Sequence, residues 1–180
     1  MLQSSSINPG RIELRPAGPA DAAHIQALVR GLTPRTRYLR FFNGVQELAL
    51  PWLQRFSRAE PHGAFTLLAT VPQSEAVIGM AHYFADPYPE RADFAIVVED
   101  AWQGHGVGRR LVCRLIQIAR ASGLQRLEAE VLSENRRALE FVERLGFESR
   151  RDAASALLVH ASLALRSKAP DYSCNAGAVG

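Results

Sequence analysis

The sequence predicts one α+β domain in which helices flank a mixed β-sheet. Within residues 64–99, three segments rich in apolar and β-branched residues follow one another closely, which indicates an antiparallel meander. From residue 107 the apolar residues change to a helical spacing, and strand-like and helical segments then alternate up to residue 165. With 180 residues, of which 47% are hydrophobic and 22% charged, the chain has the size and composition of a single domain with a substantial core.

The N-terminal part is expected to start with a flexible terminus, residues 1–10, because this stretch is polar and ends in Pro-Gly. Residues 11–17 alternate apolar and charged side chains, as a first strand does. Three helices are expected next, at residues 18–32, 33–42 and 46–60. Gly31 is expected to stop the first helix, Pro34 fits the first turn of the second, and Pro51 interrupts or restarts the third.

The C-terminal part contains further strands and two longer helices. Strands are expected at residues 64–71, 75–85, 91–99, 125–132 and 155–165, and helices at 107–121 and 135–147. Gly123 and Gly146 end the two helices, and Cys113 is expected on the polar side of the first one. Residues 167–180 lack periodicity and are expected to be disordered, so a single domain spans residues 11–166 without a linker or an internal repeat.

The charge of the chain is small and evenly spread. The formal net charge of +3 comes mostly from scattered arginines, which favours an anionic small ligand or an acidic protein partner over nucleic acid. No apolar stretch is long enough to cross a membrane and the first residues lack a secretion signal, so we expect a cytoplasmic protein without a membrane partner. Cys113 and Cys174 match no metal or disulfide spacing, so no metal site is expected.

Three glycines at alternate positions, Gly104, Gly106 and Gly108, stand between a predicted strand and a predicted helix. In this setting free backbone N–H groups and the helix dipole form an anion site, and glycine lets the backbone approach a phosphate closely. Arg109 and Arg110 add positive charge nearby. The alternative is a tight corner without a ligand. The spacing fits neither the Walker loop, which needs Lys-Ser or Lys-Thr, nor the Gly-x-Gly-x-x-Gly dinucleotide fingerprint.

Residues 103–108, Gln-Gly-His-Gly-Val-Gly, match the Gln/Arg-x-x-Gly-x-Gly/Ala signature of the GNAT superfamily, and the chain resembles these acyl-CoA-dependent N-acetyltransferases. The resemblance extends over residues 11–165, with residues 103–147 as its specific part. Residues 36–42, Thr-Arg-Tyr-Leu-Arg-Phe-Phe, are similar to bacterial Pat-type protein lysine acetyltransferases, which modify acyl-CoA synthetases. The resemblance implies the GNAT fold, with a mostly antiparallel sheet of about six or seven strands splayed between the fourth and fifth.

The resemblance also implies a site for acetyl-CoA in this splay. The pyrophosphate would lie on the backbone amides of Gln103, Gly104, His105, Gly106, Val107 and Gly108, with Arg109 beside them. The pantetheine arm would run along the strand backbone of Ile96, Val97 and Val98, paired like an added strand. Asn135 would contact the arm from the other side. Asn135 is equally suited to cap the helix that follows it, and the two roles are compatible.

Acetyl transfer to an amine needs a base, because a lysine amine with a pKa of about 10.4 is almost entirely protonated at neutral pH. Asp93 has a position similar to that of the base glutamate in protein-acetylating relatives, and its shorter side chain favours a bridging water. Glu130 is the second candidate, since strand alternation places Glu128 and Glu130 on one face. The alternative is that these carboxylates are only solvated. Many relatives carry a tyrosine acid where this sequence has Val142, so no such acid is carried over.

Two classes of function remain open. The first is an acetyl-CoA-dependent N-acetyltransferase that acts on a primary amine, either a protein lysine or a small-molecule amine. The second is a non-catalytic acetyl-CoA-binding sensor. Arg35, Arg37 and Arg40 would meet an acidic surface of a partner such as an acyl-CoA synthetase, or else be solvated. His82 and His160 are expected in structural hydrogen bonds, and both a monomer and a homodimer are open.

Overall fold

The structure is a computed structural model that describes residues 12–72, 74–86, 91–153 and 155–165. The predicted flexible terminus, residues 1–10, and the predicted disordered tail, residues 167–180, lie outside these ranges. The strands are β1 (Glu13–Pro16), β2 (Ala64–Val71), β3 (Ala76–Ala85), β4 (Arg91–Val98), β5 (Arg126–Leu132), β6 (Glu148–Arg151) and β7 (Leu158–Ala164). The α-helices are α1 (Ala22–Gly31), α2 (Pro34–Phe41), α3 (Leu50–Phe56), α4 (Val107–Ala121) and α5 (Arg136–Arg144), and short 3-10 turns are η2 (Pro19–Asp21) and η3 (Asp100–Trp102).

The strands form one seven-stranded sheet in the order β1-β2-β3-β4-β5-β7-β6. Antiparallel pairing joins β1 to β2, β2 to β3 and β3 to β4, so the predicted meander is confirmed. Antiparallel pairing also joins β5 to β7 and β7 to β6. The two groups meet through a parallel pair, β4 and β5. The predicted α+β fold with a mixed, mostly antiparallel sheet is therefore confirmed.

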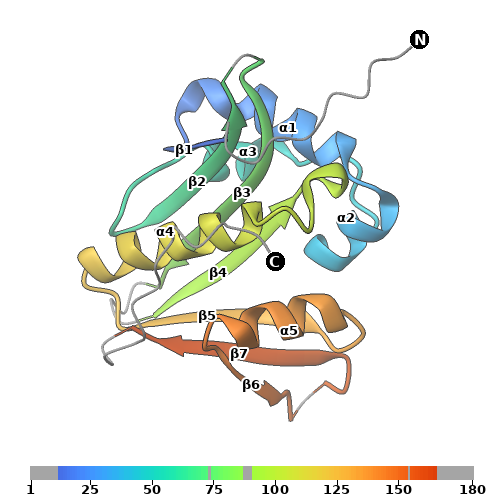
Figure 1. The fold of residues 1–180 in the computed structure, drawn as a ribbon, viewed down its shortest axis with the longest axis vertical. Coiled ribbons are helices and arrows are strands. Elements are labelled where there is room, and N and C mark those ends of the chain that lie inside the picture. The colour runs from blue at the N-terminus through green and yellow to red at the C-terminus, as the bar shows by residue number, and fades with distance from the viewer. Residues whose placement is uncertain (1–11, 73, 87–90, 154, 166–180) are drawn as a thin grey trace.

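β4 and β5 separate soon after they meet (Figure 1). Their parallel register covers three residue pairs, which are Arg91 with Arg126, Ala92 with Leu127, and Asp93 with Glu128. From Phe94 onward, no strand in the described part of the chain pairs with this edge of β4. The predicted splay between the fourth and fifth strands is thus present, and it begins directly after Asp93.

Helices cover both faces of the sheet (Figure 1). α4 crosses β2, β3 and β4 and shares with α5 the larger core, around Leu111 and Leu127. α1 and α3 cover the opposite face around Leu68 and Met80. Cys113 is fully buried in the larger core, so its predicted place on a polar side is wrong; α4 lies across three strands and buries a wider face than its apolar stripe indicated. Within the described ranges, no helix is long and apolar enough to cross a bilayer.

The capping residues and prolines start the helices as expected. One short strand, β6, was not predicted from the sequence. Thr33 accepts a hydrogen bond from the N–H of Thr36 at the start of α2, and proline occupies the first turns of α2 and α3. β6 was not predicted, because Glu148–Arg151 is entirely polar and has no alternation to mark it. β6 forms the sheet edge only by pairing with β7.

A buried carboxylate holds the segment between β1 and α1. Asp21 is 5% exposed, and it accepts hydrogen bonds from Arg15 at 2.8 Å to Nη1 and 2.7 Å to Nη2. The Gly18 N–H donates a third hydrogen bond at 2.8 Å. The hydrogen bonds from Arg15 outweigh the opposing effect of burial and hold the pKa of Asp21 below its ordinary value. This carboxylate therefore ties β1 to the start of α1.

Asp21→Asn is expected to lower the free energy of unfolding at neutral pH by about 2 kcal/mol, because charge-assisted hydrogen bonds are lost. Since the folded-state pKa is lowered, the contribution is present above about pH 4 and is lost as the pH falls through the folded-state pKa. Denaturant melts of both proteins at about pH 7 and about pH 3 should therefore show a difference that narrows in acid.

Glu47→Gln is the matched control for this prediction. It removes an exposed ion pair with Arg30, whose Nη2 lies 2.8 Å from the Glu47 carboxylate. Exposed pairs of this kind contribute less than about 1 kcal/mol. If both variants lost the same free energy of unfolding, the buried position of Asp21 would not be what makes its ion pair important.

Candidate active site

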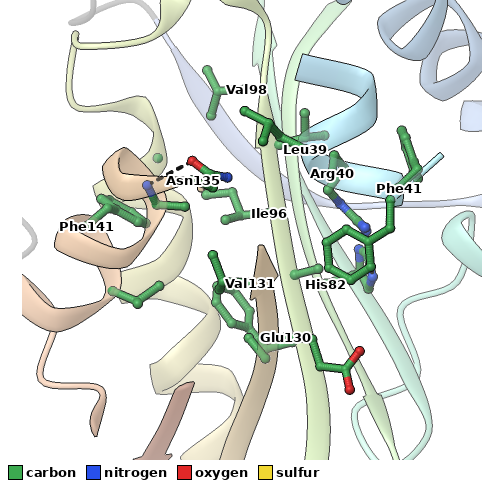
Figure 2. A pocket seen from close by; sticks show the side chains of 18 of the residues that line it. Leu39, Arg40, Phe41, His82, Ile96, Val98, Glu130, Val131, Asn135 and Phe141 are labelled. Atoms are coloured by element: carbon green, nitrogen blue, oxygen red, sulfur yellow. Dashed lines mark hydrogen bonds between the residues drawn. The ribbon is translucent and has the colours of Figure 1, made fainter. Parts of the chain in front are cut away.

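A cleft opens where β4 and β5 part (Figure 2). Its walls are formed by α2, β3, β4, the glycine turn, β5 and the first turns of α5. In Figure 2, Asn135 and Phe141 lie on one side of Ile96, and Arg40 and His82 lie on the other. The cleft therefore gathers side chains from segments that are far apart in the sequence.

The glycine turn requires glycine at two of its three positions. Gly104 and Gly106 have φ angles of 81° and 80°, in the left-handed region. Gly106 is also the N-cap of α4, so the first N–H groups of this helix, which have no intrahelical acceptor, emerge here. Gly108 has no such requirement, because an added Cβ would lie 3.5 Å from Ile96 and 3.6 Å from Phe141 at the cleft wall, at ordinary contact distances.

Side chains fix the turn to β4 and α5. Gln103 Nε2 donates to the carbonyl oxygen of Val98 at 3.0 Å, and Gln103 Oε1 accepts from Arg137 Nη1 at 2.9 Å. Arg137 lines the cleft beside the turn, and the sequence analysis did not single it out. Its place in the first turn of α5, two residues after Asn135, is the signal that could have indicated it.

Most residues expected to hold the cofactor line this cleft, namely Ile96, Val97, Val98, Gln103, Gly104, Gly106, Gly108, Arg109 and Asn135. Val107 does not, because its side chain is 1% exposed in the core, and His105 is exposed outside the lining. Arg110 donates to the carbonyl oxygen of Ile12 at 3.0 Å, away from the cleft lining. Contacts through the backbone of His105 and Val107 stay a prediction.

Asn135 caps α5. Its Oδ1 accepts a hydrogen bond from the N–H of Ala138 at 3.2 Å (Figure 2). The interpretation of Asn135 as a helix cap is confirmed, and the same residue lines the cleft. Val142, about two helical turns after Asn135, is 3% exposed and offers no proton.

The candidate bases lie on one face of the sheet, where the strands part. Asp93 is in register with Glu128 of β5, and Glu130 follows two residues later on the same face. Glu128 is held near Arg91 at 3.8 Å and Arg126 at 3.9 Å. Asp93 and Glu130 are exposed in the cleft lining, and neither has an ion-pair partner within 4.0 Å among the described residues. Such a carboxylate is available to accept a proton.

Glu130 also lies beside a histidine and an aspartate. His160 Nε2 and Asp152 Oδ2 are 2.7 Å apart, so the hydrogen bond expected for His160 is present. The ligand atoms of Glu130, Asp152 and His160 all lie within 4.8 Å of one another, which would allow a metal ion, although exposed acidic groups of this kind are common without one. No spacing in the sequence marks this cluster, because its three residues come from β5, β7 and the turn between β6 and β7.

α2 places Arg40 in the cleft against β3. Arg40 Nη2 lies 3.2 Å from His82 Nε2, and His82 is 4% exposed. Burial lowers the pKa of Arg40 to about 10, so the guanidinium stays charged at neutral pH. Burial and the charges of Arg40 and Arg55 hold the pKa of His82 well below its ordinary value, so the imidazole is neutral.

The other two arginines of α2 are engaged within the chain. Arg35 pairs with Glu134, in the turn between β5 and α5, at 2.9 Å. Arg37 donates to the carbonyl oxygens of Leu32 at 2.6 Å and Arg30 at 3.2 Å. Each of the three arginines therefore has a different environment, although Arg35 and Arg40 line the same cleft.

Asp100 ties α2 to the segment that precedes the glycine turn. Its carboxylate accepts hydrogen bonds from the Thr33 N–H at 3.0 Å, the Thr33 hydroxyl at 2.9 Å and the Thr36 hydroxyl at 2.6 Å. Burial opposes ionisation, but these hydrogen bonds outweigh it and lower the pKa of Asp100. The start of α2 and the approach to the glycine turn are thus joined through one side chain.

A comparison with known families identifies this arrangement. The model of the Acetyltransferase (GNAT) family matches residues 33–147, from the start of α2 to the end of α5 and beyond. The chain belongs to this family. As a GNAT acetyltransferase it is an acyltransferase enzyme, and the predicted family resemblance is confirmed.

Individual GNAT relatives agree with this assignment. The chain is 25% identical over 163 residues to acetyltransferase PA5475 of Pseudomonas aeruginosa, covering 89% of this chain and 88% of the relative. The GNAT domain of S. lividans PAT has a TM-score of 0.78 and 24% identity, covering 85% of this chain and 90% of that domain. The structure of yncA from Salmonella typhimurium with its cofactor acetyl-CoA has a TM-score of 0.69 and 23% identity, covering 89% and 98%. These structures show the same fold.

Gly106→Ala is expected to lower the free energy of unfolding by about 1–2 kcal/mol, because alanine would have to keep a left-handed φ. Gly108→Ala is the matched control, since its added Cβ makes contacts of ordinary length and a helix favours alanine over glycine. Denaturant melts of the two variants provide the comparison. If Gly108→Ala lowered the free energy of unfolding as much as Gly106→Ala, the left-handed φ of Gly106 would not be the reason that this position needs glycine.

Proposed function

We propose that this acetyltransferase takes its acetyl group from acetyl-CoA and transfers it to a primary amine. The observation that carries the proposal is the cleft, where the glycine turn at the start of α4 meets the unpaired edge of β4. A helix start suits a pyrophosphate, and an unpaired strand edge suits an arm that contains amide groups. The yncA structure, which has the same fold, contains acetyl-CoA.

The proposed cofactor contacts combine backbone and side-chain groups. The backbone N–H groups from Gln103 to Gly108 would hold the pyrophosphate, while Arg109 and Arg137 supply positive charge at the cleft wall. The backbone from Ile96 to Val98 would pair with the pantetheine arm, which Asn135 faces from α5. Arg137 is an addition to the set expected from the sequence, supported by its hydrogen bond to Gln103.

Asp93 is the proposed general base, acting directly or through one water, with Glu130 as the second candidate. Once the ammonium group has lost its proton, the amine nitrogen attacks the thioester carbonyl carbon in a ternary complex. The C–N bond forms, the C–S bond breaks, coenzyme A leaves as a thiolate, and the nitrogen loses its second proton to solvent. The thiolate takes a proton from solvent, because Val142 provides none. The position of Asp93 at the point where β4 and β5 part supports this role.

We propose a protein lysine as the acceptor, such as a lysine of an acyl-CoA synthetase. The support is the resemblance of residues 36–42 to Pat-type enzymes, and several of these residues, including Thr36 and Phe42, line the cleft. A small-molecule amine is the alternative acceptor. The short side chain of Asp93 and Val142 would also fit an acetyl-CoA sensor without turnover, but membership of an acetyltransferase family stands against this second candidate.

Arg137→Gln is expected to raise the dissociation constant for acetyl-CoA about 10-fold, because one charge-assisted contact is lost. Arg136→Gln is the matched control, since Arg136 is exposed on the same helix and does not line the cleft. Isothermal titration calorimetry with acetyl-CoA measures both. Failure of the wild type to bind acetyl-CoA would overturn the proposed function, and equal affinities of the two variants would remove Arg137 from the site.

Asp93→Asn is expected to lower kcat by about 100-fold or more across the accessible pH range, without weakening acetyl-CoA binding. The measurement is thiol release with lysine peptides, acyl-CoA synthetases and small amines as acceptors. Glu128→Gln is the matched control on the same face, where arginines already hold the carboxylate. Glu130→Gln tests the second candidate.

Three outcomes separate the alternatives. Loss of turnover in Asp93→Asn alone supports this base, whereas loss in Glu130→Gln alone transfers the role to Glu130. Tight acetyl-CoA binding without turnover on any acceptor would favour the sensor.

A further inference from the structure

Arg40 and His82 form a cationic pair on the face of the sheet that carries the candidate bases. His82 is in register with Ala95 of β4, and Phe84, two residues later on β3, is in register with Asp93. His82 therefore points to the same face as Asp93. The neighbouring register positions along β4 lie about 7 Å apart. A cation and a candidate base thus stand side by side in the same cleft.

The positive charge of this pair has no counter-charge within the described residues. Arg40 has no carboxylate within 4.0 Å there, and its guanidinium contacts the neutral ring of His82. Arg40 Nε and His82 Nδ1 are both buried without a hydrogen-bond partner. Arg55 adds a second positive charge, with its guanidinium carbon 3.8 Å from the ring centre of Phe84. By contrast, Arg35 of the same helix has Glu134 as its partner.

Aromatic side chains flank the pair where it lines the cleft. The guanidinium carbon of Arg40 lies 4.8 Å from the ring centre of Phe41. The ring of His82 lies 4.7 Å from that of Phe56 and 4.6 Å from that of Phe84. An anion that enters such a low-dielectric site gains more from one arginine than it would at an exposed surface. Arg40 Nε and His82 Nδ1 lack hydrogen-bond partners in the described part of the chain and lie beside a positive charge among apolar rings. A carboxylate suits such a place because it accepts hydrogen bonds and carries negative charge.

We propose that Arg40, supported by His82, is a subsite for a carboxylate carried by the amine acceptor. This inference rests on the proposed N-acetyltransferase function and specifies its substrate class. The ammonium group of the acceptor would meet Asp93 or Glu130 while its carboxylate meets Arg40. Two sources share this chemistry: a free amino acid, and a glutamate or aspartate next to the target lysine in a protein. Arg40 is in either case a specificity-determining residue rather than a base.

The test compares acceptors in matched pairs. One arm uses α- and ω-amino acids, each as the free acid and as the amide. The other arm uses lysine peptides with glutamate or glutamine beside the lysine. Thiol release from acetyl-CoA gives kcat/KM for every acceptor with wild type, Arg40→Gln and Arg40→Lys. For each protein, kcat/KM for the acid is divided by kcat/KM for the amide. Comparing this ratio between wild type and variant cancels the intrinsic difference in reactivity between the two amines.

Arg40→Gln is expected to lower the preference for the carboxylate acceptor, taken as the ratio of kcat/KM for the acid to kcat/KM for the amide, by about 10- to 100-fold. Arg40→Lys is expected to retain part of the preference, because it keeps the charge. Arg114→Gln is the matched control, since Arg114 is exposed on α4 outside the cleft lining. A preference confined to one arm identifies the source of the carboxylate. An unchanged ratio in Arg40→Gln would overturn the proposal.

A binding measurement separates this inference from the proposed function. Calorimetry with coenzyme A-loaded protein compares N-acetylated amino acids and their amides as probes, and it requires no turnover. If the wild type binds the N-acetylated amino acids and Arg40→Gln does not, the subsite is supported even if no amine is acetylated. Turnover of amides with no role for Arg40 in either assay would overturn the subsite and leave the N-acetyltransferase intact. Circular dichroism melts confirm that Arg40→Gln remains folded.

Discussion

The short parallel pairing of β4 and β5 is the constraint on which the rest of the site depends. Three residue pairs join the strands, and the sheet then divides. Strand twist favours such separation once cross-strand contacts end. The edge of β4 becomes a wall of the cleft instead of the interior of a sheet, and the starts of α4 and α5 contribute residues to it from one face. Longer pairing would fill the cleft with backbone hydrogen bonds.

The opposite face of the splay has an uneven distribution of charge. Carboxylates of β4 and β5 gather where the strands part, with Glu128 held by arginines and Asp93 without such a partner among the residues that the structure describes. Further along, Arg40 presents positive charge beside the neutral ring of His82 and among aromatic rings. Opposite charges close together in one apolar cleft orient a ligand that carries both, because a reversed orientation would place like charges against each other.

The sequence was informative where local physics decides the structure. Glycine spacing marked the turn because Gly104 and Gly106 need left-handed backbone, and strand alternation placed Glu130 on its observed face. It was uninformative where distant segments meet. The contact of Arg40 with His82 joins residues 42 positions apart, and that of Arg137 with Gln103 joins residues 34 apart. β6 could not be predicted, because its own sequence has no strand pattern. It is a strand because it pairs with β7.

α2 links the two halves of the site mechanically. Its first turn is fixed through Asp100 to the approach of the glycine turn, and Arg40 stands near the other end of this eight-residue helix. A short helix moves as a rigid unit. A shift of its first turn, next to the proposed acetyl-CoA site, would therefore also move Arg40, next to the proposed site of the amine acceptor. Any free energy that couples the two ligands through α2 acts equally in both directions. A ligand that shifts α2 would then change the affinity for the other ligand by the same factor, whichever of the two binds first.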